Sequence, residues 1–122
     1  MKETAVAILN WNGKHWLEKF LSNVIENSLE ADVIIIDNGS TDDSLDYLSA
    51  NFPETQIIKL DDNYGFCGGY NKGLAQLKYT YFLLLNSDIE VTPNWLKPLL
   101  ESVKEENVAI IQPKILDFKN KT

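Results

Sequence analysis

Short apolar runs alternate with longer amphipathic stretches along this chain. The runs are rich in Val, Ile, Leu and aromatic residues and end in polar residues, a pattern typical of β-strands. It predicts five strands, at 6–10, 33–37, 56–60, 81–86 and 108–112. Three of the runs are almost continuously apolar, which is expected of parallel strands covered on both faces.

The stretches between the strands predict helices. Apolar residues recur at four-residue spacing over 16–25 and would form one stripe on a helix. Ser40 is followed three residues later by Asp43, which resembles a capping box that opens a short second helix.

Two further helices complete an alternating order of strand and helix. One is predicted over 69–77, and another begins at Thr92, with Pro98 kinking it or separating its first turn. The alternation favours an α/β fold, an open and mainly parallel sheet with helices on both faces. Ligands of such sheets bind outside the carboxyl ends of the strands, so candidate chemistry is expected directly after each strand.

Length and composition limit the class of protein. A chain of 122 residues with 44% hydrophobic and 24% charged residues fits one domain, predicted over 1–116, followed by a polar C-terminal end at 117–122. The net charge of -7 argues against a nucleic-acid partner. One Cys and one His exclude disulfide frameworks and metal sites built from several Cys or His, and they favour a reducing, cytoplasmic setting. No apolar run is long enough for a membrane span in this chain.

Acids, amides and small residues follow the first four predicted strands. They are Asn10 and Asn12; Asp37, Asn38 and Ser40; Asn63 and Gly65; and Asn86 and Asp88. Such residues are ordinary in turns. Asp37, however, ends a run of Val and Ile, so its carboxylate would be held on a rigid element, where it could accept hydrogen bonds from a ligand.

A glycine-rich segment lies after the third strand. Four of the six glycines fall between Gly65 and Gly73. The segment could allow close backbone approach to a negatively charged ligand at a helix N-terminus, or it could be a flexible turn with tight helix packing. It matches neither the Rossmann fingerprint nor the P-loop. Cys67 within it is interpreted as a small buried residue rather than a nucleophile.

The segment Asn86-Ser87-Asp88 is a candidate metal site. Mg²⁺ and Mn²⁺ take one or two protein carboxylates and complete their coordination with phosphate oxygens and water. One carboxylate at Asp88, with an amide two residues earlier, fits that requirement. The alternative is a turn in which Ser87 and Asp88 bond to the backbone.

Four ordered segments, 7–13, 33–42, 63–73 and 83–88, together resemble the family 2 glycosyltransferases, particularly the rhamnosyltransferase-like branch. The resemblance covers residues 5 to about 116. It implies a GT-A (Rossmann-like) fold, a nucleotide-diphosphate sugar as donor, and Mg²⁺ or Mn²⁺ bridging the diphosphate.

The resemblance also implies roles for the residues after the strands. Asn10 and Asn12 would line the nucleotide site, and Asp37 would contact the base beside Asn38 and Ser40. The loop over nucleoside and sugar would include Asn63, Gly65, Gly69 and Asn71. Asn86-Ser87-Asp88 stands in place of the family's Asp-x-Asp motif, with Asp88 as the metal ligand and Asn86 free to hydrogen-bond ribose or sugar hydroxyls.

By the same resemblance, the chain is the donor-binding half of a truncated enzyme. The full protein would transfer a sugar with inversion to the hydroxyl of a saccharide or lipid-linked saccharide in cell-surface polysaccharide synthesis, in the cytoplasm or peripherally at the inner face of the membrane. The acceptor-binding half and its general base would lie beyond Thr122, so the fragment is expected to be inactive alone.

Three further expectations accompany this interpretation. Apolar surface is expected near 108–116, where the fragment could form a homodimer. The alternative function is a non-catalytic nucleotide- or phosphate-binding α/β module. A nucleotidyltransferase is disfavoured because the segment after the first strand lacks a glycine-rich basic loop.

Overall fold

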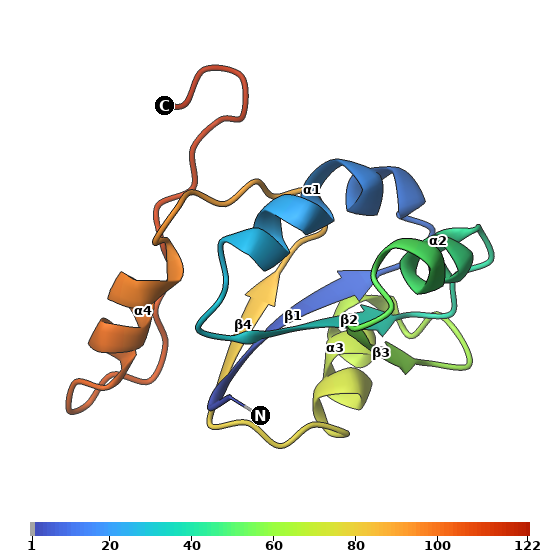
Figure 1. Ribbon diagram of the computed structural model, residues 1–122. Coiled ribbons are helices and arrows are strands. Elements are labelled where there is room, and N and C mark those ends of the chain that lie inside the picture. Colours follow the sequence, from blue (N-terminus) through green and yellow to red (C-terminus); the bar gives the residue numbers. More distant parts are fainter. Residues whose placement is uncertain (1) are drawn as a thin grey trace.

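The computed structural model describes residues 2–122 and shows an α/β fold (Figure 1). Strands and helices alternate, as the sequence predicts, and the four strands begin and end within two residues of the predicted positions. The elements are β1 (Thr4–Asn10), α1 (Lys14–Glu26), β2 (Asp32–Asp37), α2 (Ser44–Asn51), β3 (Gln56–Lys59), α3 (Gly65–Leu74), β4 (Tyr81–Leu85) and α4 (Leu96–Val103).

The four strands form one parallel sheet in the order β3-β2-β1-β4. All carboxyl ends therefore lie at the same edge. The chain adds β2 and β3 on one side of β1 and then returns to add β4 on the other side. The strand order thus reverses between β1 and β4, which is where open α/β sheets bind ligands.

Helices cover both faces of the sheet, as predicted. Alternate residues of a strand point to opposite faces. On one face, Val6, Ile8 and Ile35 pack with residues of α1 and α2, including Leu17, Leu21 and Leu48. On the other face, Ala7 and Ile36 pack against Tyr70 of α3. Figure 1 shows α1 and α2 on one side of the sheet and α3 on the other.

The predicted fifth strand at 108–112 is wrong. Within residues 2–122 this segment has no strand conformation and pairs with no other strand. An apolar run forms a strand only when a neighbouring backbone takes up its hydrogen bonds. Here the segment lies beyond α4, and Ile110 is 89% exposed. The prediction of exposed apolar surface near 108–116 is confirmed, since Ile115 and Leu116 are also exposed.

Strand β4 is covered on only part of its surface, although its run Tyr-Phe-Leu-Leu-Leu is strongly apolar. Leu85 is buried, but Phe82 and Leu84 are 37% and 54% exposed. These two side chains share the face covered by α3, because they align with Ala5 and Ala7 of β1. Helix α3 lies over β1 and β2, so this face of β4 stays uncovered.

Three helix starts differ from the predictions. Helix α2 begins at Ser44, since the Ser40 hydroxyl accepts hydrogen bonds from Asn10 and Asn12 instead of capping a helix. Helix α3 begins at Gly65, so most of the glycine-rich segment is helical and Cys67 is exposed rather than buried.

Helix α4 begins at Leu96 rather than at Thr92. Pro98 therefore lies in its first turn, where backbone N–H groups have no partner within the helix. A separate turn at 92–95, in which the Trp95 N–H donates to the Thr92 carbonyl at 3.2 Å, precedes the helix, and the helix continues past the proline to Val103.

Candidate functional site

The polar residues predicted from the sequence lie at the carboxyl edge of the sheet. Asn10 and Asp37 are the last residues of β1 and β2, and most of the others lie in the loops that follow the four strands (Figure 1). Gly65 is the first residue of α3, and Gly69 and Asn71 lie further inside that helix. Gly69 is buried, and a Cβ there would lie 2.9 Å from Asn38 Nδ2, so this glycine allows α3 to pack closely on the β2 loop. Asn71 is exposed.

A buried polar cluster joins the ends of β1 and β2. Asn10 and Asp37 are each 1% exposed. Asn10 Nδ2 donates to Asp37 Oδ1 at 3.0 Å and to Ser40 Oγ at 3.1 Å. The Ser40 backbone N–H donates to the second carboxylate oxygen, Asp37 Oδ2, at 3.0 Å. Both oxygens of Asp37 thus have partners within the protein.

One atom of this cluster is left without a partner. Asn10 Oδ1 is buried and accepts no hydrogen bond. Exchanging the two ends of the amide would bring an oxygen against the Asp37 carboxylate, so the hydrogen-bond network fixes the orientation. Asn10 Oδ1 faces Gly13, where a Cβ would lie only 2.6 Å away. A buried acceptor without a donor is unfavourable, and this one lies where the strand order reverses.

Asn12 ties the loop after β1 to the loop after β2. It has a positive φ of 48°, a conformation that Asn tolerates. Its Oδ1 accepts hydrogen bonds from the backbone N–H groups of Thr41 and Asp42, at 2.7 and 3.1 Å. Its own N–H donates to Ser40 Oγ at 3.0 Å. Two neighbouring loops are therefore held by one side chain.

Asp42 adds a further link between these loops. Its carboxylate accepts hydrogen bonds from the backbone N–H groups of Lys14 and Ser44. Partial burial by itself would raise the pKa of Asp42, but the hydrogen bonds outweigh it and hold that pKa below the ordinary value.

Asn38 ties the β2 loop to the loop after β3. Its side chain is buried and donates from Nδ2 to Asn63 Oδ1 and to the Gly65 carbonyl, both at 3.0 Å. Its Oδ1 accepts from the Tyr64 N–H at 3.0 Å. Asn63 Oδ1 also accepts from the Gly65 N–H at 2.8 Å. Gly65 has a φ of 71° and open space where a Cβ would lie.

The loop after β4 presents free polar groups. Asn86 and Asp88 are exposed, and within residues 2–122 neither side chain has a hydrogen bond or ion pair to the protein. In the described part of the chain no three His, Cys, Asp or Glu residues are grouped as metal ligands. One free carboxylate nonetheless suits a hard divalent cation whose other ligands are phosphate oxygens and water. The ligand atoms of this loop therefore fit a metal ion that arrives bound to a diphosphate, not a metal ion held by the protein alone.

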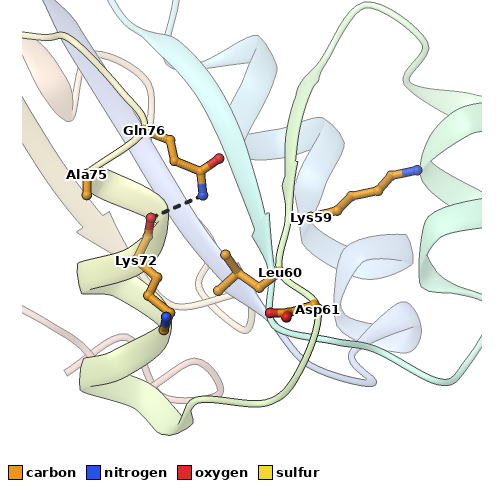
Figure 2. A pocket seen from close by; sticks show the side chains of 6 residues that line it. All are labelled: Lys59, Leu60, Asp61, Lys72, Ala75 and Gln76. Atoms are coloured by element: carbon orange, nitrogen blue, oxygen red, sulfur yellow. Dashed lines mark hydrogen bonds between the residues drawn. The ribbon is translucent and has the colours of Figure 1, made fainter.

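A shallow groove of about 390 Å³ lies between β3 and α3 (Figure 2). It is lined by Lys59, Leu60, Asp61, Lys72, Ala75 and Gln76, none of which was named from the sequence as a site residue. In Figure 2 the Lys59 side chain points away from Lys72, so the two ammonium groups do not converge on an anion.

Beside this groove, Asp61 accepts a hydrogen bond from the Tyr64 hydroxyl at 2.7 Å. That bond lowers the pKa of Asp61 and raises the pKa of Tyr64. The contact steadies the exposed loop after β3.

Asn23 of α1 belongs to no motif in the sequence, and the structure brings it into contact with the segment after β4. Its amide makes two hydrogen bonds to the backbone of Val91, in the segment after β4. The available signal was a polar residue beside the apolar positions Phe20, Leu21 and Val24 of the helix stripe.

Within residues 2–122 no helix has the length and apolar character that a membrane crossing requires.

Comparison with solved structures defines the class of the fold. Mannosyltransferase PcManGT from Pyrobaculum calidifontis, solved with GDP-Man and Mn²⁺, has a TM-score of 0.74 at 15% identity, over 85% of this chain and 33% of that chain. TarS of S. aureus, solved with UDP, has a TM-score of 0.70 at 22% identity, over 84% of this chain and 32% of that chain. The fold is that of GT-A glycosyltransferases.

The family follows from the sequence comparison. Residues 5–122 match the family described as "Glycosyl transferase family 2", and the chain belongs to that family. An uncharacterized glycosyltransferase of Haemophilus influenzae is 25% identical over 107 residues, which are 84% of this chain and 33% of the relative. The chain thus spans about a third of the length of that relative.

Proposed function

We propose that this chain binds the nucleotide-diphosphate sugar donor of a glycosyltransferase at the carboxyl edge of its sheet. The observation that carries the proposal is the gathering of acids and amides at the edge where the strand order reverses, with Asn63, Asn86 and Asp88 exposed there. The family match favours a transferase over a non-catalytic nucleotide- or phosphate-binding module. UDP and GDP-Man in the two solved structures support a nucleotide-sugar donor.

In this proposal the segment around Asn10 and Asn12 lines the nucleoside site and Asp37 contacts the base. Asn10 Oδ1 and the Asp37 carboxylate are both buried in the free chain, so a ligand reaches them when the turn at 11–13 moves aside. Asp37 holds the Asn10 amide in one orientation, because it accepts the Nδ2 hydrogen bond, and a carboxylate has about four acceptor positions, some of which remain for the base. Asn12, Asn38 and Ser40 hold the neighbouring loops in place.

The loop after β3 would close over the ligand. Gly65 has open space around it and Asn63 is exposed, so backbone and amide groups are available to nucleoside and sugar. Asn71 of α3 is assigned to the same part of the site, and Gly69 of that helix packs against Asn38 of the β2 loop.

Asp88 would hold Mg²⁺ or Mn²⁺, and Asn86 would hydrogen-bond ribose or sugar hydroxyls. A bound cation supplies charge stabilisation for the leaving diphosphate. The protein has a net charge of -7, so a cation between Asp88 and a diphosphate would also relieve repulsion. The Mn²⁺ in the PcManGT structure supports this assignment.

The whole protein is proposed to transfer the sugar with inversion to an acceptor hydroxyl of a saccharide or lipid-linked saccharide, as a hexosyltransferase-type enzyme of cell-surface polysaccharide synthesis. A general base outside this chain would deprotonate the acceptor, so the chain alone is proposed to bind the donor without transferring it. A location in the cytoplasm or at the inner face of the membrane is part of the same proposal.

Titration calorimetry tests the donor site. UDP, GDP and dTDP are titrated into the wild-type chain with Mn²⁺ and again with chelator, and at least one is expected to bind more tightly with Mn²⁺. Asp88→Ala is expected to remove the metal dependence. Asp46→Ala, which removes another exposed carboxylate on α2, is the matched control and should retain it. Binding that is equally tight with chelator would refute the role of Asp88, and no binding of any diphosphate would refute the donor site.

A further inference from the structure

The amide of Asn23 makes a two-point contact with the chain segment that follows β4. Its Nδ2 donates to the Val91 carbonyl at 3.0 Å, and its Oδ1 accepts from the Val91 N–H at 2.8 Å. Both backbone polar groups of Val91 are thereby satisfied by one side chain from α1. This is the pairing that a neighbouring strand would otherwise supply.

Val91 is also anchored by its side chain. It is 6% exposed and belongs to the core cluster that includes Leu21 and Val24 of α1. Four residues further on, the Trp95 indole N–H donates to Ser28 Oγ at 3.2 Å, just beyond the end of α1. The segment from Val91 to Trp95 is therefore fixed at one end to α1 and at the other end to the turn just after α1.

The turn that carries Asn86 and Asp88 lies between two fixed points. On one side Leu85 pairs with Ile8 in the sheet, and on the other side Asn23 holds Val91. Within the described residues, the side chains of Asn86 and Asp88 have no hydrogen bond or ion pair to the protein. Next to them Ile89 packs against the core, and Glu90 pairs with Lys121 at 3.6 Å. The position of the turn consequently depends on these neighbours and on Val91, whose backbone hydrogen bonds come from Asn23.

We propose that Asn23 is a positioning residue that sets the place of the Asp88 carboxylate relative to the donor site. Asn23 touches neither the donor nor the metal; it acts through Val91. The inference rests on the proposed function, because it assigns Asn23 to the metal-dependent part of donor binding. Helix α1 starts directly after the β1 loop, so a single rigid element connects that loop to the Asp88 turn.

The first test is backbone hydrogen exchange measured by NMR on wild type, Asn23→Ala and Asn27→Ala. Asn27→Ala is the matched control, since Asn27 Nδ2 bonds to the Asn23 carbonyl at the end of the same helix without reaching Val91. Relative to the Ile8 amide of the core, the Val91 amide is expected to exchange about tenfold faster or more in Asn23→Ala, because its acceptor is lost. Asn27→Ala should leave Val91 exchange close to wild type. Unchanged Val91 exchange in Asn23→Ala would overturn the proposal.

The second test is calorimetry on the same three proteins with UDP, GDP and dTDP, with Mn²⁺ and with chelator. Asn23→Ala is expected to weaken the Mn²⁺-dependent binding about tenfold and to leave binding in chelator unchanged, which a general loss of stability would not do. Wild-type affinity in Asn23→Ala, or an equal loss with and without Mn²⁺, would overturn the positioning role. If wild type binds no diphosphate, the proposed function itself fails, and the positioning role fails with it.

Discussion

Replacing Asn38 by Ala should be among the most damaging single amide substitutions at the carboxyl edge. The change removes three hydrogen bonds of 3.0 Å that join the β2 loop to residues 63–65. Net contributions of about 1 kcal/mol per bond give a loss of about 3 kcal/mol in the free energy of unfolding. For a domain of this size, that loss lowers Tm by roughly 8–16 °C.

Thermal and urea unfolding, followed by circular dichroism, measure this loss. Asn51→Ala is the matched control, because Asn51 makes one exposed hydrogen bond within α2 and its loss should cost less than about 0.5 kcal/mol. Asn38→Asp extends the test. A carboxylate there would face Asn63 Oδ1 and the Gly65 carbonyl, so its folded-state pKa should be raised and the variant should recover stability as the pH falls. An Asn38→Ala protein as stable as the Asn51→Ala protein would refute the claim that Asn38 holds these loops together.

Three further predictions concern packing, acid stability and association. Gly73→Ala should destabilise the fold by about 1–3 kcal/mol in urea unfolding, because the new Cβ would lie 2.5–2.7 Å from three Ile36 atoms, although Ala has the better helix propensity. Gly68→Ala is the control, since a Cβ there would meet only Tyr64 Cβ, at 3.0 Å. Equal stabilities of the two variants would contradict the packing argument. The stability contributed by the lowered pKa of Asp42 should be complete above the ordinary value of 3.8 and lost as the pH falls through the folded-state pKa. In Asp42→Asn the free energy of unfolding should therefore fall less steeply as the pH is lowered. An unchanged dependence of that free energy on pH would count against the loop contact. Ile110 and Ile115 are 89% and 66% exposed and should promote self-association, which sedimentation velocity measures. The double variant Ile110→Lys and Ile115→Lys should associate less. A strictly monomeric wild type would exclude the homodimer.

The sequence predicts most of the sheet because its signals are local. A run such as Val-Ile-Ile-Ile before Asp37 is short, apolar and β-branched, and it becomes a central strand with both faces covered. The same signal fails at 108–112, since pairing is a property of the neighbouring backbone and not of the run. It also overestimates the burial of Leu84, because α3 covers only part of that face.

The site was only partly predictable. That acids and amides gather at one edge follows from parallel strands, and the structure brings the residues after the strands together there. Their internal bonds do not follow from the pattern. Asn12 and Asn38 hold backbone groups that lie 26–30 residues away in sequence, and Asn23 holds Val91 across 68 residues. Such long-range contacts have no periodic signal in the sequence.

Paramagnetic broadening by Mn²⁺ tests the donor site most directly. NMR spectra of the wild-type chain are recorded with UDP, GDP or dTDP in excess while Mn²⁺ is added in small amounts. Broadening is expected to centre on the amides of 86–88 and to extend to 10–13 and 63–65, all at the carboxyl edge. Asp88→Ala is expected to remove the effect. Broadening centred on the opposite edge, at Asp32 and Glu54, or no broadening with any diphosphate, would contradict a donor site at the carboxyl edge.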